Sequence, residues 1–187
     1  MRQNPESKIK HLIYHHERKA STLAKAPKLQ KTNAMRELES AGIDFVVHTY
    51  EVDENDLSGV HVAHQLGEDV DVVFKTIVTV SPSGNHVVCC IPVAESIDLK
   101  AAAAAMGEKK LEMVHVKDLL GLTGYIRGGC SPVGMKKKFD TVFDETCQLF
   151  DTIIVSGGRR GTQIECKPED LIGFCNAKMA DIVAKEN

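Results

Sequence analysis

Short runs of β-branched and aromatic residues recur along the chain after about residue 31, separated by turns rich in Gly, Pro, Asp and Ser. These runs predict strands. The predicted strands span residues 45–51, 72–80, 86–91, 111–115, 141–143, 153–156 and 163–166. The sequence Ser81-Pro82-Ser83-Gly84-Asn85, between the second and third runs, is typical of a β-hairpin turn.

Helices are predicted where apolar or small residues follow helical spacing, with a capping residue before the stretch or a glycine after it. The ranges are 32–38, 60–66 and 98–105, ending at Gly42, Gly67 and Gly107, and a helical turn at 117–120 that ends at Gly121. Pro168 suits a first helical turn, so a terminal helix is expected from Asp170 onward. Because strands do not alternate strictly with helices, the pattern favours an α+β fold with a mixed, largely antiparallel sheet and surrounding helices.

The chain's length of 187 residues and hydrophobic content of 43% suit one packed domain. The net charge of −3 is unevenly distributed, because residues 1–31 carry eight Lys or Arg against two Glu. This segment therefore has a net charge of +6, which leaves −9 on the remainder. We expect a basic N-terminal arm over residues 1–31, either flexible or with one short helix, followed by one folded domain over residues 32–187. Such an arm is attracted to a polyanion, although solvated termini of this kind often have no function.

No run approaches the roughly 20 apolar residues that a membrane span needs, and no apolar signal-peptide core follows the start. The six cysteines include no CxxC pair, so free thiols in a reducing compartment are expected. These features predict a cytoplasmic protein without a membrane partner. No metal or other cofactor is expected, because paired histidines such as His61 and His64 are usually solvated and a structural zinc site needs four closely paired ligands.

Lys75 is the one charged residue within the predicted strand 72–80. It shares a half-apolar face with Val73 and Ile77, because successive side chains of a strand point to opposite faces. Burial of an unpaired ammonium is costly, so this side chain must reach solvent or meet an anion. Two interpretations stay open, namely an exposed lysine on an edge strand and a functional cation.

A segment over residues 123–138, TGYIRGGCSPVGMKKK, contains too much glycine for the interior of a helix or strand and predicts a shaped loop. Its backbone N–H groups could hold a carbonyl or phosphate oxygen, and Arg127 with the lysines at 136–138 adds positive charge. A surface crossover with a solvated basic patch is the alternative. A second cluster, SGGRRG over residues 156–161, offers a phosphate the backbone of Gly157 and Gly158 and two arginines, or forms a plain hairpin.

The familiar catalytic and nucleotide-binding motifs do not fit these segments. A P-loop is excluded because Met135 occupies the position of the required lysine. The second glycine cluster precedes a predicted strand, whereas a dinucleotide site needs a helix there. There is no GxSxG or HExxH motif, and nothing in the sequence places a base beside Cys130. Nucleophilic catalysis is therefore poorly supported, and Cys130 is expected to be a passive thiol.

Three motifs together resemble the YbaK-type family of bacterial prolyl-tRNA editing proteins, by their order and their separations. They are FKT at 74–76, TGYIRGGCSPVGMKK at 123–137 and VSGGRRG at 155–161. Two further stretches, HTYE at 48–51 and AKMADI at 177–182, extend the resemblance from about Thr32 to the C-terminus. The resemblance implies a trans-editing deacylase of α+β fold, without a metal, that clears mischarged Cys-tRNA(Pro) by cleaving the aminoacyl ester, with Cys-tRNA(Cys) as a further candidate substrate.

The resemblance also assigns site residues, because in that family the lysine matching Lys75 is central and the loop matching Gly128 to Pro132 surrounds the aminoacylated 3′ end. Catalytic roles are implied for Lys75, Gly129 and Ser131. Substrate-binding roles are expected for Tyr50, Thr76, Gly128, Cys130, Pro132, Asp144, Gly157 and Gly158. The stretch DENDLSG at 53–59 is one residue shorter than expected and lacks an aromatic residue, which alters the expected pocket there.

As a mechanism, we expect Lys75 to pair with the terminal phosphate or ribose, and loop N–H groups to hold the ester carbonyl where negative charge develops. A water, a ribose hydroxyl or the substrate's own thiol could attack, and thiol attack would make the enzyme a lyase. An unguarded enzyme would also strip correct Cys-tRNA, so prolyl-tRNA synthetase is an expected partner. The alternatives are a non-catalytic module that binds a tRNA 3′ end and an Ala-tRNA(Pro) deacylase of the same fold. The sequence leaves the oligomeric state open.

Overall fold

A computed structural model describes residues 30–185 of the protein. The expected basic arm at 1–31 lies outside these residues except for its last two positions, so the arm stays a prediction. The described helices belong to one compact unit, which begins at Lys31. They are α1 (Asn33–Ser40), α2 (Gly59–Leu66), α3 (Leu99–Met106), α4 (Val116–Thr123), α5 (Pro168–Cys175) and the 3₁₀-helix η1 (Glu145–Leu149). The strands are β1 (Val46–Thr49), β2 (Phe74–Val80), β3 (His86–Pro92), β4 (Glu112–Met113), β5 (Asp140–Asp144), β6 (Ile153–Arg159), β7 (Thr162–Cys166) and β8 (Lys178–Ala180).

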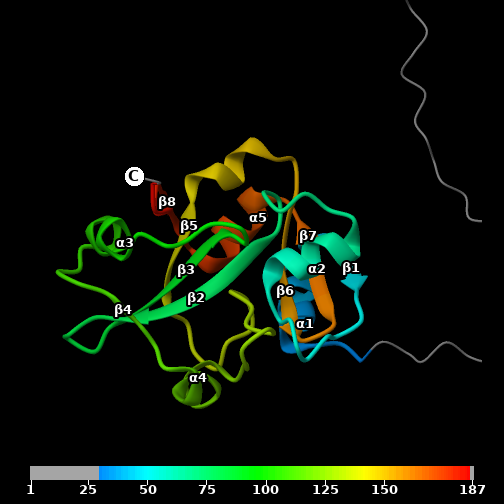
Figure 1. The fold of residues 1–187 in the computed structure, drawn as a ribbon, viewed down its shortest axis with the longest axis horizontal. Helices are drawn as coiled ribbons and strands as arrows, with labels where there is room; N and C mark the ends of the chain where they lie inside the picture. Colours follow the sequence, from blue (N-terminus) through cyan, green and yellow to red (C-terminus); the bar gives the residue numbers. More distant parts are fainter. Residues whose placement is uncertain (1–29, 186–187) are drawn as a thin grey trace, which may run out of the picture. The chain divides into compact units, whose positions relative to one another are not determined.

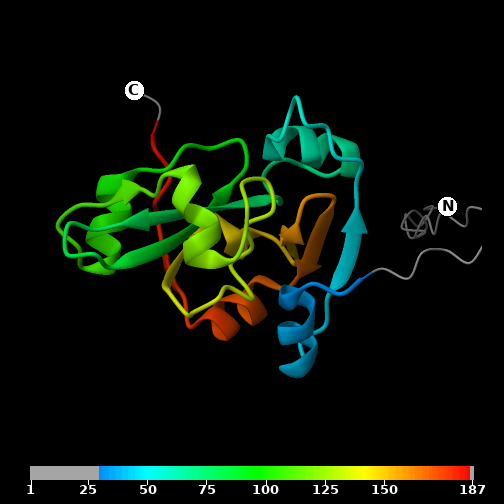
Figure 2. The same ribbon diagram turned by 90° about the horizontal axis from the view of Figure 1, so that it is seen from below.

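The strands form two sheets that meet near the start of β2. The smaller sheet is antiparallel in the order β1-β7-β6, and the larger one has the order β4-β2-β3-β5-β8. In the larger sheet β2 is antiparallel to both neighbours, whereas β5 is parallel to β3 and to β8. A single bridge between Val73 and Ile154 connects the two sheets. Figures 1 and 2 show α1 and α2 beside the smaller sheet and α3 at the larger one. The α+β prediction is confirmed, with two sheets in place of one.

The predicted helix boundaries are confirmed where the sequence supplies a capping side chain or a closing glycine. Thr32 caps α1 by accepting a hydrogen bond from a backbone N–H at 3.2 Å. Asp98 caps α3 by accepting from two backbone N–H groups at 2.8 and 3.0 Å. Gly67 and Gly107 end α2 and α3 with φ angles of 73° and 74°, a left-handed conformation that favours glycine.

The predictions fail mainly in the second half of the chain. Helix α4 continues past Gly121 to Thr123, and Gly124, with φ of 85°, ends it instead. Helix α5 starts at Pro168 as predicted, but it ends at Cys175 because Asn176 adopts a left-handed φ of 48°. The segment that follows was predicted as helix, and it instead forms β8 beside β5. The strand predicted at 111–115 is reduced to the two residues of β4.

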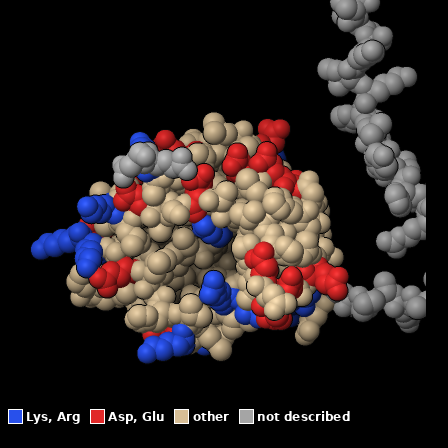
Figure 3. Space-filling model, viewed as in Figure 1, with Lys and Arg blue, Asp and Glu red and all other residues tan. Residues whose placement is uncertain are grey.

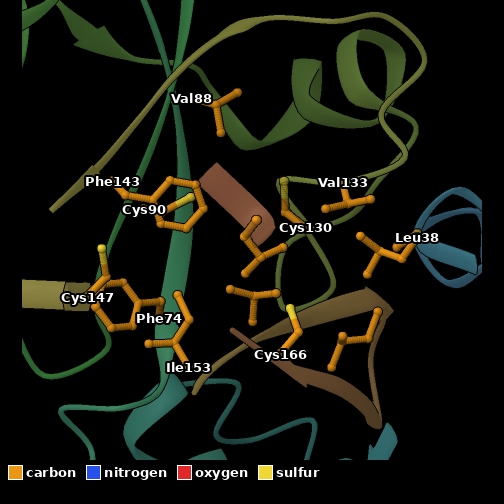
Figure 4. Packing of buried hydrophobic residues seen from close by; sticks show 14 of the residues in the cluster. Leu38, Phe74, Val88, Cys90, Cys130, Val133, Phe143, Cys147, Ile153 and Cys166 are labelled. Carbon is orange, nitrogen blue, oxygen red and sulfur yellow. The ribbon is translucent and has the colours of Figure 1, made fainter. Parts of the chain in front are cut away.

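The main hydrophobic core lies between the two sheets and fixes the start of β2. Phe74 of β2, Phe143 of β5 and Ile153 of β6 are all at most 2% exposed and belong to this core. Figure 4 shows these side chains close together, with cysteines packed among them. All six cysteines of the chain are free thiols, as predicted. Most of them therefore act as small apolar side chains in the core.

Most of the loop predicted at 123–138 is confirmed, because residues 124–139 have no helix or strand, whereas Thr123 belongs to α4. The loop packs closely against α1 at Gly134. A Cβ added to Gly134 would lie 2.7 Å from the backbone nitrogen of Ala34 and 2.7 Å from the hydroxyl of Tyr125. The Tyr125 hydroxyl itself donates to the carbonyl of Val133 at 2.7 Å. Helix α1 and the buried tyrosine therefore determine the path of the loop.

We predict that Gly134→Ala lowers the free energy of unfolding by about 3 kcal/mol, combining a left-handed conformation with overpacking. Gly84→Ala is the matched control, because Gly84 also has a positive φ, 89°, but has no atom within 4 Å of the added Cβ. The control should lose only the backbone cost of about 1–2 kcal/mol. Urea denaturation measures both, and equal losses would contradict the close packing of α1 against the loop.

Candidate active site

A cleft of about 320 Å³ lies where the two sheets meet. Its walls come from the end of β1, the start of α2, the strands β2, β6 and β7, and the Gly-rich loop. The lining residues are Tyr50, Leu57, Ser58, Gly59, Val62, Val73, Phe74, Lys75, Thr76, Ile77, Val93, Arg127, Gly128, Cys130, Ser156 and Gln163. Figure 3 shows a hollow at the middle of this face with Lys and Arg atoms beside it.

Lys75 reaches into the cleft and is held there by backbone carbonyl groups. Its ammonium donates to the carbonyl oxygen of Val93 at 3.0 Å and to that of Glu95. Burial lowers the pKa of Lys75, and the nearby Glu95 carboxylate opposes this shift. Because both hydrogen-bond acceptors are neutral, the positive charge remains available to a ligand. The interpretation as a surface lysine does not fit this half-buried position.

The structure brings Tyr50, Thr76, Gly128 and Cys130 to the same cleft as Lys75. The Tyr50 backbone N–H donates to the carbonyl of Gly161 at 3.2 Å, which holds the end of β1 beside the turn between β6 and β7. Thr76 lies within 3.9 Å of the Cys90 sulfur, so its hydroxyl makes at most a weak contact there. The cleft therefore combines the half-buried Lys75 cation with several neutral polar groups.

The backbone N–H groups of the loop at Gly128–Cys130 differ in whether they already have a hydrogen-bond acceptor. The Gly129 N–H is engaged, because it donates to the carbonyl of Ile126 at 3.0 Å. A Cβ on Gly129 would lie 3.0 Å from backbone atoms of Arg159 and Arg160, so a larger residue would require this backbone to shift. The N–H groups of Gly128 and Cys130 have no acceptor within residues 30–185. These two groups, rather than that of Gly129, are available to an oxyanion.

Burial raises the pKa of the Cys130 thiol to about 12. The thiol is therefore protonated at neutral pH, as expected for a passive loop cysteine. Ser131 is fully buried, and its hydroxyl oxygen accepts from the Val133 N–H at 3.3 Å. Neither side chain is placed as a nucleophile, and Ser131 does not line the cleft.

The structure places the remaining predicted site residues outside the cleft. Pro132 lines a separate hollow near α5. Gly157 and Gly158 pack tightly, with added Cβ atoms 2.8 Å from the Thr162 side chain and 3.1 Å from Tyr125. Glycine at these two positions is therefore explained by packing within the fold.

Asp144 is also separate from Lys75, because its carboxylate is buried at the end of β5. One oxygen accepts from the Thr146 N–H at 3.1 Å and from the Thr146 hydroxyl at 2.7 Å. The other accepts from the Ile182 N–H at 2.9 Å. These bonds attach the C-terminal segment to η1 and explain an aspartate at this position without a substrate.

Three polar cleft residues, Ser58, Ser156 and Gln163, were not assigned to the site from the sequence. Ser156 was expected at the end of a strand and the start of the second glycine cluster, and Gln163 only as the start of a strand. Ser156 and Gln163 lie opposite each other on β6 and β7, so their side chains share one face of the smaller sheet. The alternation of Gln163 and Glu165 along β7 was the available signal, although an alternating strand is equally typical of a solvated face.

Three residues beside the cleft, Glu54, Arg127 and Arg160, are joined by hydrogen bonds. The Arg160 guanidinium donates to the Arg127 carbonyl at 2.9 Å and to the Glu54 carboxylate at 2.8 Å. It thereby joins the shortened stretch 53–59, the Gly-rich loop and the β6–β7 turn. Arg127 lines the cleft and forms no ion pair with any described residue.

Within residues 30–185, no three or more His, Cys, Asp or Glu side chains gather as a metal site would require. None of the helices in this range has the length and apolar character needed to cross a membrane. The expectation of a reaction without a cofactor stays a prediction.

Comparisons with known proteins identify relatives of this chain in sequence and in fold. A protein of Enterococcus faecalis (strain ATCC 700802 / V583) named as a Cys-tRNA(Pro)/Cys-tRNA(Cys) deacylase, EbsC, is 46% identical over 164 residues, covering 88% of this chain and all of that protein. The crystal structure of a trans-editing enzyme for prolyl tRNA synthetase matches with a TM-score of 0.70 at 22% identity, over 82% of this chain and 96% of that one. The structure of hypothetical protein APE2540 matches with a TM-score of 0.75 at 19% identity, over 82% of this chain and all of that one.

At these identities the two structures establish the fold alone. The family model for the aminoacyl-tRNA editing domain matches residues 57–174, which include Lys75, the Gly-rich loop and Gln163. Together with the relative that is similar over its whole length, this match shows that the chain belongs to the aminoacyl-tRNA editing domain family.

Proposed function

We propose that this protein is a trans-editing deacylase that removes cysteine from mischarged Cys-tRNA(Pro) by cleaving the aminoacyl ester. The observation that carries the proposal is the Lys75 ammonium, held by two neutral carbonyl groups in a cleft of about 320 Å³. Such a volume is at the small end of ligand sites, and suits an amino acid with part of the terminal nucleotide. Family membership and the similarity to a Cys-tRNA deacylase support the reaction class.

The two cations and the Gly-rich loop bind different parts of the substrate. Arg127 at the cleft mouth faces the terminal phosphate, and Lys75 deeper in the cleft faces the ribose and the ester. Negative charge develops on the ester carbonyl oxygen during attack, where the N–H groups of Gly128 and Cys130 can stabilise it. Each preorganised donor of this kind contributes about 3 kcal/mol to transition-state stabilisation.

The attacking group comes from outside the protein, because Ser131 is buried and the Cys130 thiol is protonated. If water attacks, its oxygen bonds to the carbonyl carbon, the bond to the ribose oxygen breaks, and that oxygen takes a proton. The products are then cysteine and deacylated tRNA. If the substrate thiol attacks instead, a carbon–sulfur bond forms as the same ester bond breaks, and the ribose oxygen takes up the proton that the thiol loses. The products are then a cyclic thiolactone and deacylated tRNA.

Prolyl-tRNA synthetase is the proposed partner. The cleft can read the amino acid and the terminal nucleotide, but it is too small to distinguish one tRNA body from another. A synthetase that holds tRNA(Pro) would supply this distinction. The net charge of +6 on residues 1–31 would add attraction to the RNA.

We predict that Lys75→Met lowers kcat/KM on Cys-tRNA(Pro) at least 100-fold, because the mutation removes the half-buried cation beside the ester. Lys110→Met is the matched control, since the Lys110 side chain is 65% exposed and outside the cleft. The measurement is release of labelled cysteine, with Ala-tRNA(Pro) alongside. A wild type that binds and protects the cysteinyl ester would indicate a non-catalytic module, and one that clears only the alanyl ester would indicate the alanine-specific alternative.

Arg127→Gln should raise KM about three- to tenfold while kcat stays nearly constant, because a phosphate contact binds ground state and transition state alike. The salt dependence should also weaken, with the slope of log KM against log salt falling by about one. Arg36→Gln, an exposed change on α1, is the control and should leave the slope unchanged. An unaltered slope in the Arg127 variant would show that this guanidinium does not meet a phosphate.

The partner proposal predicts a change in specificity. With prolyl-tRNA synthetase present, deacylation of Cys-tRNA(Pro) should accelerate relative to that of Cys-tRNA(Cys), because only the first RNA is held by the complex. Parallel time courses of both substrates, with and without the synthetase, measure the ratio. A ratio that the synthetase leaves unchanged would remove it as the source of tRNA selection.

A further inference from the structure

Gln163 has an unusual position for a polar side chain. It lies on β7, the middle strand of the smaller sheet, and is 6% exposed. Its Oε1 atom makes no hydrogen bond, and within the described part of the chain it is the one buried side-chain nitrogen or oxygen atom in this condition. Buried polar atoms in folded proteins are nearly always paired, so this exception needs an explanation.

The surroundings of Gln163 supply no protein partner for its carboxamide. His48, directly opposite on β1, is paired with the Glu165 carboxylate at 2.7 Å. Ser156, directly opposite on β6, accepts a hydrogen bond from the Gly158 N–H at 3.3 Å, and its hydroxyl makes no hydrogen bond to the Gln163 oxygen. In the structure this oxygen is inaccessible, and a half-turn about the last side-chain bond, which exchanges the oxygen and nitrogen of the carboxamide, moves it out of that position. The open side of Gln163 is the cleft itself.

The cleft is lined by two cations and several uncharged polar residues, and Gln163 is one of the uncharged residues. Lys75 and Arg127 are its two cations, whereas Tyr50, Ser156 and Gln163 line it without charge. An aminoacyl ester carries a positive α-ammonium group next to its carbonyl. The two cations repel that ammonium, so the favourable orientation places the ester toward Lys75 and the ammonium toward the uncharged acceptors.

We infer that Gln163 binds the α-amino group of the aminoacyl ester through its carboxamide oxygen, and thereby orients the ester toward Lys75. The inference rests on the proposed function for the identity of the ligand, an α-aminoacyl group on a terminal nucleotide. A neutral acceptor holds the ammonium without neutralising Lys75, which a carboxylate at the same position would do. Gln163 is in this account a binding and positioning residue, and it takes no part in bond cleavage.

The test compares two non-hydrolysable adenosine amides, one bearing cysteine and one bearing 3-mercaptopropionate, which is cysteine without its α-amino group. Wild type should bind the cysteinyl amide about tenfold more tightly, the effect of one hydrogen bond to a charged group. Gln163→Met has nearly the same shape and should lose this preference, binding both amides with the weaker affinity. Gln148→Met, an exposed change on η1, should retain the wild-type preference.

Thermal unfolding supplies a readout that a structural role would not give. Because the Gln163 oxygen has no partner in the fold, its replacement by an apolar side chain should leave Tm unchanged or raise it. Equal weakening of both amides, or an unchanged preference in Gln163→Met, would overturn the inference. The proposed function fails separately, if wild type binds the cysteinyl amide with a Gln163-dependent preference but releases no cysteine from Cys-tRNA.

Discussion

The burial of one ammonium group against neutral carbonyl oxygens is the constraint on which the candidate site depends. The pairing of β2 with β3 places Lys75 opposite Ile91, two residues before the segment whose carbonyl groups receive the ammonium. The core residue Phe74 fixes the neighbouring position on β2. The lysine is therefore held by the same contacts that hold the sheet together, and its charge is left without a hydrogen-bonded anion.

The smaller sheet supplies uncharged polar residues to the cleft. The bridge from Val73 to Ile154 brings β6 and β7 against the start of β2, so an uncharged polar row faces the cation. The Gly-rich loop completes the wall, and its path is set by Gly129 against the β6–β7 turn and by Gly134 against α1. In the proposed binding mode, an ester between these elements would meet positive charge at its oxygen atoms and neutral acceptors at its amino end.

Local signals were sufficient to predict most elements of this fold. Thr32, Asp98 and the closing glycines marked helix ends because caps act within one turn of the chain. The segment after α5 was wrongly predicted as helix. It forms β8, a short strand that is defined by its neighbour β5 rather than by its own sequence. For the same reason β4, two residues long, could not be delimited.

The site was partly predictable for a similar reason. Lys75 was identifiable as a charge within an apolar strand, and the loop by its glycine content. Asp144 resembled a pocket residue, yet its carboxylate binds Ile182 and Thr146, contacts that join distant parts of the chain. Gln163 could not be recognised from the sequence, because its missing hydrogen bond exists only in the packed structure.

The most direct test of the central claim is an NMR titration of Lys75 in protein with ¹³C-labelled lysine side chains, assigned with Lys75→Met. The account predicts that the pKa of Lys75 lies below that of the exposed lysines, because burial disfavours its charge. Addition of a non-hydrolysable cysteinyl amide of the terminal tRNA nucleotides should shift this pKa, because the ligand displaces water from the Lys75 ammonium, and should leave the exposed lysines unchanged. A Lys75 that titrates with the exposed lysines and does not respond to the ligand would contradict the account.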